Sequence, residues 1–180
     1  MRKKLFSAGE FEKVSLETFM RDTQPFFNDE YAQEERYHNL ELPTRATSGS
    51  AGYDFKAPFG FTLAPGESIK LPTGIRAKIT DGWWLACVPR SSLGFWYRVQ
   101  LDNTIGVIDS DYYNADNEGH IFAKLTNDSK DGKKMIVHAG DAFMQGIFLP
   151  YGVTHSDAAS GVRSGGIGST SKPYVEVVGK

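Results

Sequence analysis

Several features that would assign a function directly are absent from this sequence. Its 180 residues include one cysteine, Cys87, so no internal disulfide can form. The four histidines stand far apart, and no HExxH, CxxC or similar spacing occurs, which argues against a transition-metal site built by the protein. No run approaches the roughly 20 apolar residues of a membrane span, and Met1 to Lys4 lead into polar sequence. We therefore expect a cytoplasmic protein without a membrane partner.

An excess of charge of one sign is also missing. The formal net charge is -2 at pH 7 and the basic residues are scattered, so we expect no nucleic-acid partner. The sequence does contain material for one hydrophobic core, with 40% hydrophobic and 13% aromatic residues. Cys87 lies in the apolar run Trp83 to Val88, which predicts a buried structural thiol. One compact domain with attachments is the expected organisation.

Residues 1–39 predict a helical N-terminal extension. A capping serine followed by an amphipathic pattern predicts a short helix over residues 15–23. Pro25 interrupts that pattern, and Asn28-Asp29 can cap a second, polar helix that runs to Tyr37.

Residues 40–156 predict a β-sheet core. Short apolar runs punctuated by glycine and proline follow one another, and Ile75, Ala77 and Ile79 alternate with polar residues. No helical periodicity is visible between about 44 and 155, so a sandwich or jelly roll is the expected architecture.

The tail, residues 157–180, predicts a flexible arm. Its first part, 157–171, holds four glycines and four serines and cannot build a core. By composition alone, this segment is a disordered linker.

Four segments at strand ends or glycine turns carry the polar groups that a triphosphate requires. They are Ala51 to Asp54 (preceded by Leu42 to Thr47), Pro89 to Gly94, Asn103 to Tyr112, and Gly140 to Gln145. The second combines a guanidinium, hydroxyl groups and backbone amides, as an anion site requires. Taken singly, each segment has a simpler explanation: Arg90 as a surface ion pair, Asp109 as a turn former, and Gln145 as a solvated strand residue.

The order and spacing of these segments, together with the tail Arg163 to Thr170, resemble the five ordered motifs of the trimeric dUTPases. The resemblance covers about residues 42–171, and the extension and the segment Phe95 to Asn103 look like a subgroup from Gram-positive bacteria. It implies an all-β, jelly-roll-like (β-clip) core and a homotrimer with shared active sites. The implied reaction is magnesium-assisted hydrolysis of dUTP to dUMP and pyrophosphate, which limits uracil in DNA and supplies dUMP for dTMP synthesis.

The resemblance also implies a role for each motif. Asp109, a carboxylate at the end of an apolar strand, is the expected general base for the attacking water. Tyr112 is expected to pack on the sugar and exclude a 2'-hydroxyl, and a β-hairpin between about Asn103 and Tyr112 to read uracil through backbone groups. Asp54 is expected to orient the Arg90 side chain without contacting the substrate itself. The expected substrate-binding residues are Arg90, Ser91, Ser92, Asn103, Gly106, Tyr112, Gln145, Arg163, Ile167, Gly168, Ser169 and Thr170. Mg²⁺ is expected to bind mainly to phosphate oxygens and water, without a protein ligand set.

This sequence departs from the family pattern at three places. Ile167 stands where most members have an aromatic residue that stacks on uracil, so apolar covering is expected in place of stacking. The run Tyr113 to Gly119 predicts a lengthened loop before the strand at Ile121, and Arg163 precedes the paired glycines by a shorter gap than in some relatives.

Three other functions compete with this one. The dCTP deaminases share the fold but need a glutamate on the strand after the third motif, where Lys124 stands. A non-catalytic nucleotide-sensing protein would keep the binding groups and contact a protein partner. The third is a β-sandwich interaction module whose motifs occur by chance. The extension fits a trimer-stabilising pad and a partner-binding surface equally well.

Overall fold

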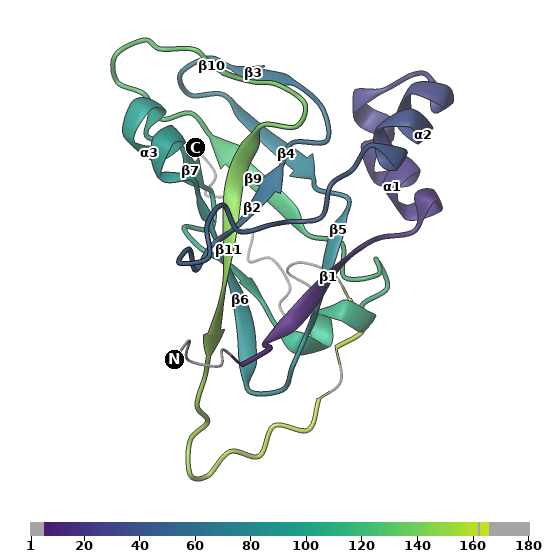
Figure 1. Cartoon of the computed structure of the whole chain (residues 1–180), viewed down its shortest axis with the longest axis vertical. Helices are drawn as coiled ribbons and strands as arrows, with labels where there is room; N and C mark the ends of the chain where they lie inside the picture. The colour runs from purple at the N-terminus through teal and green to yellow at the C-terminus, as the bar shows by residue number, and fades with distance from the viewer. Residues whose placement is uncertain (1–5, 162, 166–180) are drawn as a thin grey trace, which may run out of the picture.

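The computed structural model describes residues 6–161 and 163–165, a mainly β structure with helices at its periphery (Figure 1). The strands are β1 (Gly9–Lys13), β2 (Tyr53–Lys56), β3 (Phe61–Leu63), β4 (Ser68–Pro72), β5 (Ile75–Ile79), β6 (Trp83–Pro89), β7 (Gln100–Leu101), β8 (Gly106–Ile108), β9 (Phe122–Thr126), β10 (Met135–Val137) and β11 (Ala142–Pro150). The helices are α1 (Leu16–Thr23), α2 (Glu30–His38), α3 (Ser91–Tyr97) and the 3-10 helices η1 (Gln24–Phe26) and η2 (Ser110–Asn114). Among the described residues, no helix has the length and hydropathy to cross a membrane.

The strands pair antiparallel throughout the described chain and confirm the expected all-β class. The largest sheet has the order β2-β11-β6-β8, a second has the order β4-β9-β7, and β1-β5 and β3-β10 form two-stranded sheets. The β6-β11 ladder is the longest, running from Pro89 opposite Met144 to Trp83 opposite Pro150. β6 is therefore a long inner strand of the largest sheet, with β11 on one side and β8 on the other.

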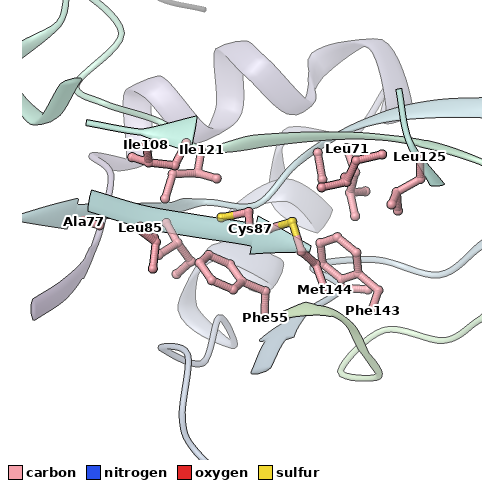
Figure 2. Close-up of a cluster of buried hydrophobic side chains, with 14 of the residues drawn as sticks. Phe55, Leu71, Ala77, Leu85, Cys87, Ile108, Ile121, Leu125, Phe143 and Met144 are labelled. Carbon is pink, nitrogen blue, oxygen red and sulfur yellow. The ribbon is translucent and has the colours of Figure 1, made fainter. Parts of the chain in front are cut away.

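The core lies between these sheets, and its residues follow the period-two pattern of the strands. Ile75, Ala77 and Ile79 are buried, as their alternation predicts. Phe143 and Met144 are adjacent and both buried, because a register irregularity in β11 next to them turns consecutive side chains inward. Figure 2 shows this cluster, with the sulfur atoms of Cys87 and Met144 inside it. Full burial of one such leucine or phenylalanine contributes about 1.5–3 kcal/mol.

The predicted helices α1 and α2 are present, and Figure 1 shows them together at one side of the β structure. The Ser15 hydroxyl accepts a hydrogen bond from Thr18 N at 3.1 Å, and the Asp29 carboxylate accepts one from Tyr31 N at 3.1 Å. The extension is not wholly helical, however, because β1 precedes α1 and pairs with β5 over its whole length. The partner strand is more than 60 residues away, so no local pattern indicated this pairing.

Two expectations for the core were wrong. Helix α3 lies inside the region where no helix was expected; none of its residues is buried, so it leaves no apolar stripe in the sequence. The hairpin expected between Asn103 and Tyr112 does not form in the described chain. β7 pairs with β9 and β8 pairs with β6, so the turn between β7 and β8 joins two different sheets.

Candidate functional site

Three predicted polar residues come together at one end of the largest sheet. Gln145 on β11 lies opposite Asp54 of β2 on one side and Val88 of β6 on the other. Arg90 follows β6, and its Nε lies 3.3 Å from Asp54 Oδ1. Its backbone N–H donates to Phe143 O at 3.2 Å, which fixes the chain at this point. The predicted contact between Asp54 and Arg90 is therefore present, and the strand register brings Gln145 beside it.

Gly52 makes room for the Gln145 amide. A Cβ atom at residue 52 would lie 2.2 Å from Gln145 Oε1 and 3.1 Å from its Cδ. Atoms this close must move apart, so the absence of a side chain at Gly52 allows the amide to occupy its place. The glycine of the first motif thus positions the glutamine of the fourth.

Ser91 and Ser92 are exposed in the first turn of α3, directly after Arg90. Arg90 itself is extended, with φ -65° and ψ 142°, and no side chain caps the helix. Both hydroxyls therefore lie on the same end of the molecule as Arg90 and Gln145. We call Asp54, Arg90, Ser91, Ser92 and Gln145 the phosphate-side cluster.

Asp109 lies at the opposite end of β6. Ile108 on β8 pairs with Leu85, so Asp109 comes level with Trp84, six residues before Arg90. At about 3.3 Å per strand residue, this places Asp109 about 20 Å from the phosphate-side cluster along β6. The Asp109 side chain is 46% exposed. It borders a hollow of about 460 Å³ lined by Trp84, Val107, Asp109, Ser110, Asp111 and Tyr151.

A single chain therefore does not bring all its predicted catalytic groups together. The phosphate-side cluster and Asp109 occupy the two ends of one extended strand, and a strand cannot fold back without losing its ladder. If all of these residues act on one substrate, the Asp109 must come from a second copy of the chain. This separation is a property of the register of β6 and could not be seen in the sequence.

Arg163, at the start of the tail motif, lies against Asp109 of its own chain. Its guanidinium Nη2 donates to Asp109 Oδ2 at 2.8 Å, and its Nε lies 3.2 Å from Asp111 Oδ1. Ser164 O accepts from Asp116 N at 3.0 Å. These two residues of the arm therefore contact their own chain, because two carboxylates attract the guanidinium. Ile167, Gly168, Ser169 and Thr170 lie outside the described residues.

Tyr112 is buried, with 2% of its surface exposed. Its hydroxyl donates to His120 O at 2.7 Å and accepts from Asn117 Nδ2 at 2.8 Å. The Arg163 guanidinium lies 5.5 Å from the centre of the ring. The predicted contact of this ring with a sugar stays a prediction, and it requires Arg163 to leave that position.

The turn predicted to read the base borders a small cavity. Asn103 and Gly106 line a space of about 50 Å³ together with Leu101, Cys87 and other apolar side chains. Thr104 in this turn has φ +66°, a rare conformation for a β-branched residue. Such strain persists where the surroundings fix the backbone, and it concentrates at binding and catalytic sites.

His120 was not singled out in the sequence, and its partner is 98 residues away. The ring is fully buried, and its Nδ1 lies 2.6 Å from Asp22 Oδ2. Its Nε2 accepts from Gly74 N at 2.8 Å, so the ring proton belongs on Nδ1. Both nitrogens are engaged, and this pair therefore ties α1 to the core and is not a catalytic dyad. In the described part of the chain, no group of three or more histidine, cysteine or carboxylate side chains is arranged to hold a metal ion.

Comparisons with known proteins point to one family. The dUTPase family model matches residues 38–171. The deoxyuridine 5'-triphosphate nucleotidohydrolase of Lactococcus lactis is 39% identical over 140 residues, which cover 75% of this chain and 92% of that protein. The crystal structure of a Streptococcus mutans dUTPase has a TM-score of 0.60 and 32% identity, covering 81% of this chain and 98% of that one.

A more distant structural match adds information on the fold alone. The dUTPase of phage phi11 of S. aureus, described with a structural Mg(II) ion, has a TM-score of 0.56 at 18% identity and covers 68% of this chain and 92% of that one. The jelly-roll fold expected from the sequence is consistent with both solved structures. The extent of the family match and the identity to the Lactococcus protein show that this chain belongs to the dUTPase family.

Proposed function

We propose that this chain hydrolyses dUTP to dUMP and pyrophosphate. The observation that carries the proposal is the convergence of Asp54, Arg90 and Gln145 at one end of the largest sheet in a member of this family. A guanidinium, an amide and two nearby hydroxyls form a donor set for a triphosphate chain. Asp54 holds the Arg90 guanidinium in place from behind.

Asp109 acts as the general base. A water molecule loses a proton to the carboxylate while its oxygen forms a bond to the α-phosphorus. The bond from that phosphorus to the bridging oxygen breaks, and pyrophosphate leaves. Asp109 is half exposed at a hollow and bound by Arg163, whose release would free it to accept the proton.

Selection of dUTP falls to the turn beside β8 and to Tyr112. Backbone groups between Asn103 and Gly106 form hydrogen bonds with uracil. Cytosine would place a hydrogen-bond donor against a donor there, and this mismatch discriminates strongly against dCTP. The Tyr112 ring packs on the deoxyribose and excludes a 2'-hydroxyl. From the tail, Arg163, Ile167, Gly168, Ser169 and Thr170 close over the bound nucleotide.

In this proposal the phosphate-side cluster would hold Mg²⁺ through the bound substrate and not through protein ligands. The phosphate oxygens and water supply its ligands, which suits an ion that keeps several water molecules. The donor set of the phosphate-side cluster is cationic and neutral apart from Asp54, and it therefore suits phosphate oxygens and not a bare cation. When bound, the ion would supply positive charge next to the leaving pyrophosphate.

The active enzyme is a homotrimer in which each site combines residues of different copies. The separation of about 20 Å along β6 supports this, because one chain cannot supply both halves. Two exposed apolar side chains, Val107 and Tyr151, also line the Asp109 hollow. Such a patch is typical of a surface covered by another subunit.

The dCTP deaminase alternative finds no support at Lys124. Its Nζ lies 2.6 Å from Asp102 Oδ2 on the exposed side of β9, so this residue forms a surface ion pair. A deaminase requires a carboxylate at that position.

The proposal is tested by measuring pyrophosphate release with Mg²⁺ from dUTP, dTTP, dCTP and UTP. We expect turnover of dUTP to exceed the other three, and Asp109→Asn to lose roughly 10² to 10⁴ in kcat while still binding dUTP. Equal turnover of all four nucleotides would refute the proposed specificity. Near-normal turnover by the Asp109→Asn protein, with dUTP binding verified by calorimetry, would remove Asp109 from the base role.

A further inference from the structure

We infer that Glu118 is a positioning residue that ties the turn carrying Asp109 to the first helix of the N-terminal extension. This inference rests on the proposed role of Asp109. It gives the extension and the lengthened loop 113–120 a shared part in catalysis, by holding the general base in place.

The contact between Glu118 and α1 is dense. Glu118 Oε2 accepts from Ser15 N at 2.8 Å, and Oε1 accepts from the Ser15 hydroxyl and the Thr18 hydroxyl, each at 2.6 Å. Burial raises the pKa of Glu118, but the hydrogen bonds from Ser15 and Thr18 outweigh it and leave the pKa lowered. One carboxylate thus accepts hydrogen bonds from three donors at the start of a helix, 100 to 103 residues away in sequence.

The backbone at Glu118 is held in a conformation that its side chain does not favour. Its φ is +59°, and its N–H donates to Ala115 O at 2.7 Å. Residues other than glycine are uncommon in this region, and the three bonds from Ser15 and Thr18 help to hold Glu118 there.

The next residue transmits this constraint to the catalytic turn. Gly119 has φ +68°, and a Cβ there would lie 2.7 Å from Tyr112 O and 2.8 Å from Tyr113 Cα. The loop therefore returns in direct contact with the backbone of η2. Tyr112 N in turn donates to Asp109 O at 3.2 Å. Two backbone contacts, Gly119 with Tyr112 and Tyr112 with Asp109, therefore connect the neighbour of Glu118 to the general base.

Two further contacts hold the same segment to the extension. The Tyr113 hydroxyl donates to Glu12 Oε2 on β1 at 2.7 Å, and His120 pairs with Asp22 of α1. Glu118 lies between them in sequence and is the one nearest the start of α1. The three contacts together tie η2 and the loop after it to the extension.

The position of Glu118 predicts an effect on turnover and not on substrate affinity. The phosphate-side cluster is about 20 Å from Asp109 along β6, and the base-reading turn precedes β8. Tyr112 also lies on η2, but its hydroxyl keeps its own hydrogen bonds to His120 O and Asn117 Nδ2 when Glu118 is replaced. Loosening η2 therefore acts mainly on the Asp109 carboxylate, and small displacements of catalytic groups slow reactions by tenfold or more.

The first experiment compares Glu118→Gln with the control Glu17→Gln. The control removes an exposed charge from the first turn of α1, which is the turn that Glu118 contacts. We expect Glu118→Gln to lower kcat about tenfold with KM changed by less than about threefold, and Glu17→Gln to behave as wild type. Melting temperature and native mass are measured for both. Wild-type kcat in a folded Glu118→Gln protein would overturn the inference.

A second pair of variants acts from the helix and does not alter the loop. Thr18→Val removes the hydroxyl that donates a hydrogen bond to Glu118 and keeps the volume of the side chain. Thr18→Ser keeps the hydroxyl. We expect kcat to fall in Thr18→Val and to be retained in Thr18→Ser, which a general packing role would not produce. Equal losses in the two variants, or a loss in Thr18→Val that appears wholly in KM, would overturn the inference.

Asp109→Asn is assayed in parallel to separate this inference from the proposed function. If Asp109→Asn turns over dUTP normally, the proposed base is wrong and the inference falls with it. If Asp109→Asn is inactive while Glu118→Gln and Thr18→Val keep wild-type kcat, the positioning role alone is wrong.

Discussion

Gly52→Ala offers a direct test of how the first and fourth motifs cooperate. The new methyl group would lie 2.2 Å from Gln145 Oε1, whereas ordinary contacts of a Cβ atom begin at 3.4 Å. The amide must therefore move by more than 1 Å. Because this atom is the far end of a flexible side chain, it can swing away, and we expect little loss of folding stability.

The magnitude follows from the bond that the displaced amide would lose. A hydrogen bond to a charged group contributes about 1.5–3 kcal/mol, which corresponds to about 10- to 150-fold in affinity for the triphosphate. The backbone cost is small, since Gly52 does not have a positive φ. Replacing glycine by alanine at such a position can stabilise a chain by about 0.4–1 kcal/mol through the unfolded state.

The assay measures KM for dUTP in the active enzyme and calorimetric binding of dUTP in an Asp109→Asn background. Gly49→Ala is the matched control, because a Cβ at Gly49 in the preceding loop meets nothing within 4 Å. We expect weaker binding in Gly52→Ala and unchanged binding in Gly49→Ala, with similar melting temperatures. Gly52→Ala is then combined with Gln145→Ala, where it should have no further effect. Wild-type binding by Gly52→Ala, or a full additional loss in the combined variant, would refute the reasoning.

Three other predictions concern assembly, pH and thiol chemistry. Asp109→Asn and a chain truncated after Gly161 should each be inactive alone. If the tail serves a neighbouring copy, refolding the two chains together at equal amounts should restore about a quarter of the sites. Mixed trimers without activity would show that the tail does not serve a neighbouring copy. Glu118 and Asp22 both have lowered pKa values, so their stabilisation is complete above the ordinary carboxyl range near about pH 4 and is lost as the pH falls through the lowered values. Urea unfolding at a series of pH values should show this loss. The free energy of unfolding should depend less steeply on pH in Glu118→Gln than in the wild type. Burial raises the pKa of the Cys87 thiol to about 12, so it should resist alkylation at pH 8 in the folded protein and react in urea; rapid labelling of the native chain would contradict its burial.

Local sequence patterns determined the elements whose stabilising groups lie nearby in the chain. Ser15 and Asp29 cap α1 and α2 by accepting hydrogen bonds from backbone N–H groups two or three residues further along the chain. A local sequence pattern therefore predicts these caps. The buried alternation of β5 and the burial of Cys87 were predicted for the same reason, since an apolar pattern records which side chains face the core. The resemblance to the dUTPases also rested on short segments in a fixed order.

Tertiary structure decided whatever depends on pairing between distant segments. Strand β1 was missed because its partner β5 lies more than 60 residues away, and α3 because it buries no side chain. The sequence placed Arg90 and Asp109 in one candidate site. The register of β6 shows that, within one chain, the two residues lie at opposite ends of that strand.

The loop 113–120 shows the limit most clearly. The sequence revealed that it is long, and gave no sign of what it contacts. Its Glu118 meets α1 across 103 residues of chain, and its φ is positive, which is uncommon for a residue other than glycine. A residue held against its own preference by a distant partner carries no local signal, and for that reason its role emerges from the folded structure alone.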